Sequence, residues 1–151
     1  MKTEPDVFSI DDLQRRGKEP WDGVRNYQAR NHMRAMTVGD LALVYHSNAA
    51  PPGVAGLARI SRAAHPDPSA WNPKSPYFDP KSSSDAPRWD MVEVAFVEKF
   101  PRFVALEELK ADPELTDMIV TKRSRLSVQP VAPEHFARVL ALAQARHIVS
   151  P

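Results

Sequence analysis

Apolar positions recur with a helical spacing in several short stretches of the chain. Residues 10–16 come directly after Ser9, and Asp12 stands three positions further on, which is the spacing of a capping box at a helix start. Residues 26–36 carry three apolar side chains on one helical face, which predicts a second helix. Further helices are expected at residues 106–110 and 133–143.

Short apolar runs and alternating patterns predict the strands. Residues 41–45 form an apolar run, and residues 54–60 form a second strand after a Pro-Pro-Gly turn. Residues 89–96 alternate with a period of two. Residues 126–131 read as a last strand at an edge of the sheet, because Pro130 cannot donate a hydrogen bond. Short strands mixed with a few helices predict an α+β fold with a small, barrel-like sheet.

Two stretches read as loops. Residues 17–23 contain a proline, a tryptophan and an aspartate between two glycines. Residues 65–88 carry six prolines and no glycine, so they cannot form one regular element. A loop of that length inside a small domain is usually functional or mobile. Its role, and above all that of residues 75–85, stays unassigned.

The length and composition predict one intracellular domain. A chain of 151 residues fits a single domain, residues 1–151, with 42% hydrophobic and 26% charged residues. The absence of cysteine excludes a disulfide framework, a thiolate nucleophile and a Cys-ligated zinc site. No stretch has the apolar length of a membrane span, and the charged first residues are not a signal peptide, so a cytoplasmic location is expected.

The charges are balanced overall but unevenly placed. Twenty Lys and Arg against nineteen Asp and Glu leave a net charge of +1, which argues against a protein that coats long nucleic acids. Two segments contain arginines and no acid: one between Gly23 and Gly39, the other between Ile119 and Pro133 and including Arg123. They predict a small positive site, although two solvated faces of unrelated elements would look the same.

A first polar cluster runs from Trp21 to Asn31 and combines an indole, a tyrosine, amides and two guanidinium groups. Stacking surface together with directed hydrogen bonds is what the recognition of an unstacked base requires. The structural alternative is a tryptophan that fills the core and an Asn26 that caps the helix. Asn26 alone fits the cap, but the cluster as a whole favours recognition.

Two further polar clusters lie at the ends of predicted strands. Residues 45–48 (Tyr-His-Ser-Asn) follow a strand, where a rigid scaffold commonly presents functional groups. His46 and Ser47 would point to opposite faces of a strand, so they do not form a nucleophile–base pair, and a half-buried structural histidine is an equal alternative. Residues 124–130 interleave hydroxyls, an arginine and an amide with apolar side chains, which line a pocket wall or face water.

The sequence contains no recognisable catalytic or metal-binding motif. There is no G-x-S-x-G, no phosphate-binding glycine loop, no H-E-x-x-H and no His/Asp group with metal spacing. We therefore predict no catalytic residue, no metal and no cofactor. The alternative is an enzyme that acts on a nucleotide or base with His46 or Asp22 as general base, which lacks a nucleophile and a metal.

Seven motifs spread over nearly the whole chain resemble the EVE family. They are Lys2–Pro5, Trp21–Asn31, Tyr45–Asn48, Gly53–Gly56, Pro66–Asp67, Trp89-x-Met91-Val92 and Arg125–Pro130. The second of them, W-D-G-V-R-N-Y-Q-A-R-N, is the most specific. Family members usually have a few apolar residues before the Lys-x-Glu-Pro motif, so the first strand is expected to be short or the start site to be assigned differently.

The resemblance implies a PUA-like β-barrel flanked by helices, related to the YTH and ASCH domains. It also implies a cleft for a flipped-out or single-stranded base, with modified cytosine in DNA as the favoured ligand and a modified base in RNA as the alternative. The implied partner is therefore nucleic acid that carries a modified base. The protein is expected to bind it as a monomer, and no membrane partner is expected. Any effector, such as a nuclease, is expected on a separate chain.

By position in the family motifs, Trp21 and Trp89 are implied as aromatic walls of the base pocket. Phosphate contacts are implied for Arg25, Arg30 and Arg125. The other residues implied at the pocket are Lys2, Thr3, Asn26, Tyr27, Asn31, Tyr45, His46, Ser47, Asn48 and Ser127.

Overall fold

The computed structural model describes residues 1–122 and 125–147, so Arg123 and Ser124 of the basic segment and the third polar cluster lie outside the described residues. Its elements are β1 (Lys2–Thr3), α1 (Ile10–Arg16), β2 (Lys18–Trp21), α2 (Tyr27–Arg34), β3 (Leu41–His46), β4 (Gly53–Pro66), β5 (Asp90–Ala105), α3 (Leu106–Ala111) and α4 (Pro133–Leu142). Short 3-10 helices lie at Pro68–Trp71, Pro113–Leu115 and Ile119–Lys122.

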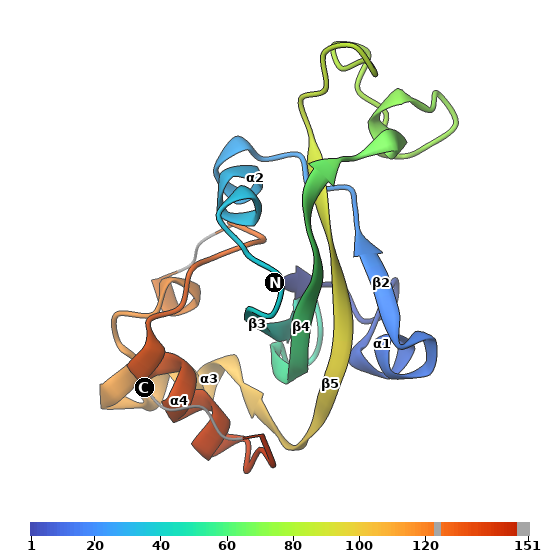
Figure 1. Ribbon diagram of the computed structural model, residues 1–151. Coiled ribbons are helices and arrows are strands. Elements are labelled where there is room, and N and C mark those ends of the chain that lie inside the picture. Colours follow the sequence, from blue (N-terminus) through green and yellow to red (C-terminus); the bar gives the residue numbers. More distant parts are fainter. Residues whose placement is uncertain (123–124, 148–151) are drawn as a thin grey trace.

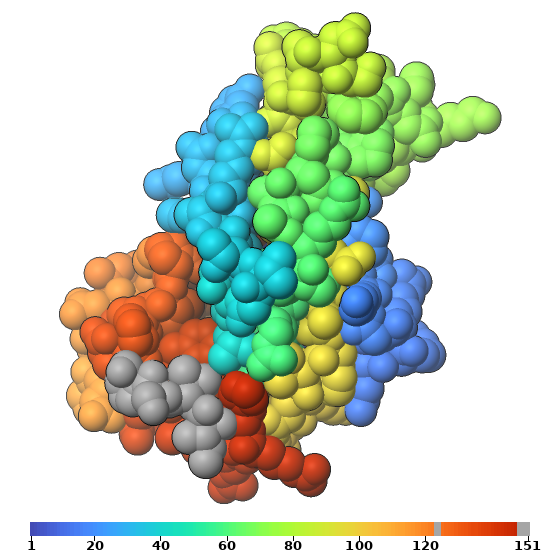
Figure 2. Space-filling model, in the orientation of Figure 1, coloured from blue at the N-terminus to red at the C-terminus, as the bar shows by residue number. Residues whose placement is uncertain are grey.

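One mixed sheet with the strand order β1-β3-β4-β5-β2 organises the molecule. The long, bent strands β4 and β5 form its central ribbon, and the loop that joins them projects from one end of the molecule (Figures 1 and 2). β1 runs parallel to β3, and the other neighbours are antiparallel. The ribbon is kinked by several irregularities of register, which bend it between the two groups of helices.

The sheet is open, which corrects the expectation of a closed barrel. β1 is only two residues long, and it pairs with β3 but not with β2 at the other edge. Residues 126–131, expected as a last strand, are irregular; Ser127 meets the sheet through one bond, from the Lys2 N–H to its carbonyl at 2.8 Å. A proline in this short segment leaves too few donors for a ladder that would close the sheet.

The predicted helix starts are confirmed by their hydrogen bonds. Ser9 and Asp12 form the expected capping box at α1, and the Asn26 side chain accepts the Ala29 N–H at 3.0 Å at α2. α4 begins at Pro133, and Ala132 provides no side-chain cap, as expected from its type.

Strands extend further than the local patterns predict. Residues 18–21, expected inside a loop, form β2 against Val92–Ala95 of β5. Pro20 is tolerated there because β2 is an edge strand. β4 continues to Pro66 and β5 to Ala105, well beyond the expected ends. In each case the pairing partner stabilises residues whose own pattern is not strand-like.

Two apolar clusters lie on opposite faces of the sheet. The first packs α1 and α2 against one face and contains Val44, whereas the second packs α3 and α4 against the other and contains Leu43 and Tyr45. Successive residues of β3 therefore point to opposite faces. No helix within residues 1–122 and 125–147 has the length and apolarity needed to cross a membrane.

The loop between β4 and β5 is held by its own polar contacts. The Asp67 N–H donates to the Trp89 carbonyl at 2.9 Å, which closes the base of the loop. Within it, the Trp89 indole N–H donates to Asp79 Oδ2 at 2.7 Å, and the Asp79 N–H donates to the Ala70 carbonyl at 2.9 Å. These hydrogen bonds preorganise the loop in the absence of a ligand.

Candidate functional site

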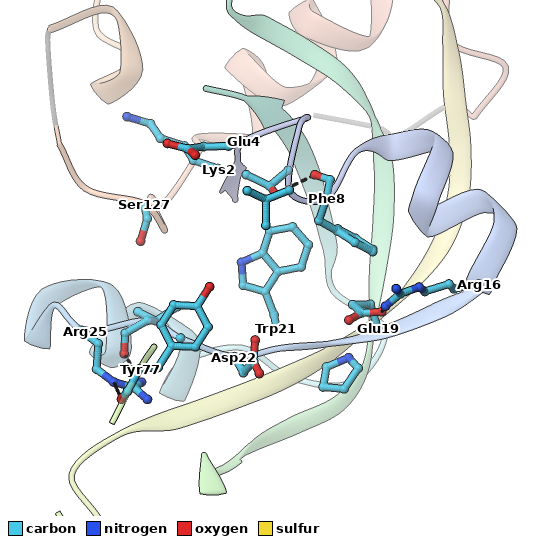
Figure 3. Close-up of a pocket in the computed structure, with 15 residues that line it drawn as sticks. Lys2, Glu4, Phe8, Arg16, Glu19, Trp21, Asp22, Arg25, Tyr77 and Ser127 are labelled. Atoms are coloured by element: carbon cyan, nitrogen blue, oxygen red, sulfur yellow. Dashed lines mark hydrogen bonds and ion pairs between the residues drawn. The ribbon is translucent and has the colours of Figure 1, made fainter. Parts of the chain in front are cut away.

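A cleft of about 410 Å³ opens between the first residues of the chain, the end of β2 and the β4–β5 loop (Figure 3). Its lining comprises residues 2–4, 7, 8, 16, 19–25, 77 and 127. Four separate parts of the sequence therefore meet at one edge of the open sheet.

Trp21 forms one wall of this cleft. It is the last residue of β2, only 8% exposed, and its ring meets Phe8 edge-on with 6.1 Å between centroids. Figure 3 shows the indole nitrogen on the side that faces Tyr77 and Ser127 across the cavity. Among the described residues this N–H has no hydrogen-bond acceptor. The wall therefore offers a stacking surface and a free donor together.

Tyr77 lies across the cleft from Trp21 and comes from the β4–β5 loop, for which we had no prediction (Figure 3). Its ring sits directly on Gly23: a Cβ at that position would lie 2.6 Å from Tyr77 Cζ. Gly23 also has a φ of 78°, a conformation that favours glycine, so a larger residue here would strain the backbone and displace the Tyr77 ring. The only signal in the sequence is an aromatic pair, Tyr77-Phe78, in a proline-rich polar loop.

Arg25 and Asp67 tie the turn after β2 to the loop. The Asp67 carboxylate, with its side chain fully buried, accepts the Gly23 N–H at 2.9 Å and Arg25 Nη1 at 3.1 Å. Arg25 also donates Nε to the Tyr77 carbonyl at 2.9 Å and Nη2 to Ser69 at 3.1 Å. The guanidinium group thus braces the wall that carries Tyr77.

The pKa of Asp67 reports this network. Burial by itself would raise the pKa, but the hydrogen bonds from Ser69, the Gly23 N–H and Arg25 outweigh burial and hold the pKa below its ordinary value. The residue therefore stays ionised at neutral pH and keeps its ion pair with Arg25.

Asp22 presents its carboxyl group to the cleft between the two aromatic walls (Figure 3). The residue is exposed, and among the described residues its carboxyl group has no side-chain hydrogen-bond partner. Partial burial, and then the neighbouring charge of Asp67, raise the pKa of Asp22. The cleft therefore contains the Trp21 indole N–H as a donor and the titratable Asp22 carboxyl group as an acceptor, which interacts with its own backbone N–H.

Five of the residues implied by the family motifs line the cleft: Lys2, Thr3, Trp21, Arg25 and Ser127. Burial lowers the pKa of the Lys2 amine, which lies 5.7 Å from the centre of the Tyr45 ring. Thr3 is engaged in the fold, because its hydroxyl donates to the Phe8 carbonyl at 2.7 Å.

Trp89 and its neighbours on α2 lie outside the lining. Trp89 is 6% exposed and stacks on Tyr27 with 4.6 Å between ring centroids. The Arg30 guanidinium lies over the Tyr27 ring, 4.7 Å from its centre. It also donates to the Asn31 side chain and the Arg88 carbonyl. Trp89 therefore packs between Tyr27 and the Arg25 guanidinium, which lies 5.6 Å from the centre of its ring, and it does not line the cleft with Trp21.

The predicted site residues at the end of β3 and just after it also lie away from the cleft. Tyr45 is buried beside a smaller cavity of about 40 Å³ that Lys2 and Ser127 share. Ser47 pairs through its backbone with Thr3, and the Asn48 amide lies 3.4 Å from Glu4 Oε1. Together with Asn26 and the exposed Arg125, these residues do not line the cleft.

His46 has a structural task at the start of α1. Its Nε2 accepts the Ile10 N–H at 3.1 Å, so the ring is neutral and the helix start has an extra partner. Burial lowers the pKa of His46. A ring nitrogen occupied in this way is a poor general base.

This contact predicts a pH effect on stability. Because the folded-state pKa lies below the unfolded value of about 6.5, the unfolded chain takes up the proton first as the pH falls. The stabilisation is complete above about pH 6.5 and decreases as the pH falls towards the folded-state pKa. Thermal unfolding of the wild type and of His46→Gln, whose amide oxygen is also an acceptor, should diverge over this range. Parallel pH profiles would contradict the assignment.

The described residues hold no group of three or more His, Cys, Asp or Glu side chains with the geometry of a metal site. His46 and Asp22, the two candidate general bases, are also separated, since only Asp22 lines the cleft. The cleft as built offers stacking and hydrogen bonding.

Comparison with known proteins identifies a family with this fold. The EVE domain model matches residues 1–142. Human thymocyte nuclear protein 1 is 43% identical over 163 residues, which cover 95% of this chain and 72% of that protein. A fission yeast protein, C21.03c of Schizosaccharomyces pombe, is 43% identical over 89% of this chain and 58% of its own length.

Solved structures agree with this assignment. A protein from Pseudomonas putida superposes with a TM-score of 0.91 at 53% identity, covering 95% of this chain and 97% of its own. Human THYN1, solved in complex with DNA containing 5-methylcytosine, superposes with a TM-score of 0.91 at 42% identity and covers 97% of both chains. The motifs, the open five-stranded sheet and these similarities together show that the chain belongs to the EVE domain family.

Proposed function

We propose that this chain binds DNA that carries a modified cytosine and holds the base in the cleft between Trp21 and Tyr77. The observation that carries the proposal is the pair of aromatic walls on either side of a cleft with an unpaired indole N–H and an open carboxyl group. The 42% identical relative solved with DNA containing 5-methylcytosine supports the ligand class.

The energetics suit a base that leaves the stack. Stacking on an aromatic side chain contributes about 1–3 kcal/mol per base. Extruding a base from a duplex costs a few kcal/mol. Contacts to phosphates have to offset the remainder, so the affinity is expected to be modest and salt-sensitive.

The proposed roles of the individual residues follow the cleft. Lys2, Thr3 and Ser127 line the cleft, where they offer hydrogen bonds to the base or its sugar, the Thr3 hydroxyl only as an acceptor because it already donates to the Phe8 carbonyl. Arg30 and Arg125 are proposed to meet phosphates without selecting the base, whereas Arg25 acts mainly through the wall that it braces. Trp89 contributes by supporting Tyr27 and the loop. The domain acts as a monomer in this proposal.

The proposal and the enzyme alternative differ in whether the bound base is chemically changed. His46 is committed to the Ile10 N–H, and the two carboxylates that act on Asp22 are themselves engaged, Glu19 by Arg16 and Asp67 by Arg25. A ligand that only binds stabilises the fold by mass action, by about 2.7 kcal/mol at a hundredfold excess over Kd.

The experiment compares matched duplexes that differ at one position, with 5-methylcytosine, cytosine or thymine, together with an RNA containing 5-methylcytosine. Fluorescence anisotropy should show the tightest binding to the 5-methylcytosine DNA, weakening as salt increases. Mass spectrometry of the nucleosides after long incubation should recover every base unchanged. Equal affinity for all oligonucleotides would refute the proposal that this chain recognises a modified cytosine. A chemically converted base would instead support the enzyme alternative.

A further inference from the structure

Asp22 lines the cleft, and among the described residues no other side chain forms a hydrogen bond with its carboxyl group. Its neighbours are committed: Glu19 accepts Arg16 Nη1 at 2.8 Å, and Asp67 accepts Arg25 Nη1 at 3.1 Å. The third acidic residue of the lining, Glu4, accepts the Asn48 amide at 3.4 Å, so among the described residues Asp22 is the lining acid without a side-chain partner, and it lies between Trp21 and Tyr77 (Figure 3).

We infer that Asp22 is the residue that selects cytosine, by pairing its carboxyl group with the N4 amino group and the N3 atom of the bound base. This inference rests on the proposed function and names the edge of the base that the site reads. A carboxylate oxygen is the usual acceptor for the N4 amino group of cytosine.

The second contact of this pair requires a proton. N3 of neutral cytosine carries a lone pair, which would face the second carboxylate oxygen, so the two acceptors need a shared hydrogen between them. The proton comes from solvent when the base binds. Thymine presents an N3–H and the weakly basic O4 at the same edge, and it holds such a proton less well.

The electrostatics of the cleft favour this uptake. Burial and the negative charge of Asp67 already raise the pKa of Asp22, with a smaller contribution from Glu19, whereas a hydrogen bond from its own backbone N–H and the charge of Arg25 oppose them. The other charged or titratable groups of the lining are Lys2, Glu4, Arg16 and Tyr77. The lining of this cleft contains no histidine, whose own titration would mimic the effect.

The test measures Kd for the 5-methylcytosine duplex from about pH 6 to about pH 8. For the wild type, Kd should rise towards tenfold per pH unit above the pKa values of the free groups, because one proton is bound with the base. Asp22→Asn supplies an acceptor and a donor without a proton. It should therefore bind with no pH dependence and more tightly than the wild type at the alkaline end.

Three controls make the outcome specific. Asp117→Asn removes the same charge at an 85% exposed side chain that does not line the cleft, and should keep the wild-type pH profile. A duplex with an abasic site measures the pH dependence of backbone binding alone. Asp22→Ala should lose about tenfold or more of the preference for 5-methylcytosine over thymine, as expected for a lost base contact.

The outcomes separate the two proposals. A wild type that fails to bind any modified duplex refutes the proposed function and this inference together. A wild type that prefers 5-methylcytosine with a flat pH profile, or an Asp22→Asn variant that keeps the wild-type slope, refutes only the assignment of Asp22.

Discussion

Asp67→Ala is expected to destabilise the protein by about 3–5 kcal/mol, the cost of removing one partner from a buried ion pair. Asp67 is 1% exposed and accepts hydrogen bonds from Arg25, the Gly23 N–H and Ser69. Without the carboxylate, the Gly23 N–H loses its acceptor and the Arg25 side chain, only 22% exposed, loses its opposite charge. Denaturant unfolding followed by circular dichroism measures the difference.

The matched control for Asp67 is Asp85→Ala, an exposed carboxylate in the same loop, which should change stability by less than about 0.5 kcal/mol. Asp67→Asn keeps an acceptor oxygen and should lose less than the alanine variant, which keeps the test informative if Asp67→Ala does not fold. Equal stability of Asp67→Ala and Asp85→Ala would show that the Arg25–Asp67 ion pair contributes nothing to the stability of the fold.

The lowered pKa of Asp67 also predicts acid sensitivity. Its folded-state pKa lies below the unfolded value, so its stabilisation is fully present above about pH 4 and is lost as the pH falls through the folded-state pKa. Asp67→Asn should remove this part of the acid dependence.

Tyr77→Ala is expected to weaken binding to the 5-methylcytosine duplex by about 1–3 kcal/mol, roughly ten- to a hundredfold, because one stacking wall is lost. The side chain is 37% exposed, so the fold should lose little stability. Anisotropy titrations at one salt concentration and thermal unfolding of the same samples separate the two effects.

Phe78→Ala provides the control for Tyr77, since this neighbouring aromatic is 41% exposed and does not line the cleft. Tyr77→Phe keeps the ring and should bind within a few-fold of the wild type. If Tyr77→Ala binds as tightly as Phe78→Ala, the base does not stack on this loop.

The aromatic residues of the site show how much of it could be predicted from the sequence. Trp21 was expected at the pocket and lines the cleft, whereas Trp89 was expected beside it but stacks on Tyr27 outside the lining. Both tryptophans stand near polar residues, and a local pattern does not distinguish a ring that faces a cavity from one that supports it. Tyr77 had no prediction, because its position depends on Arg25 and Gly23, more than fifty residues away.

The sequence by itself determined the elements whose stabilising contacts are local. The capping box of α1, the Asn26 cap of α2 and the proline start of α4 all depend on hydrogen bonds or dihedral preferences within about four residues. The motifs spread along the chain were also sufficient to identify the family.

The tertiary structure alone decided whether the sheet closes, where β2 lies and which aromatic residue faces Trp21. β2 exists because β5 pairs with it, and the sheet stays open because a two-residue β1 and the irregular segment around Pro130 offer too few ladder bonds. Tyr77 reaches the cleft because Asp67 and Arg25 hold the loop against the turn at Gly23. These contacts join residues far apart in the chain, so their free energy depends on the assembled fold and not on any local pattern.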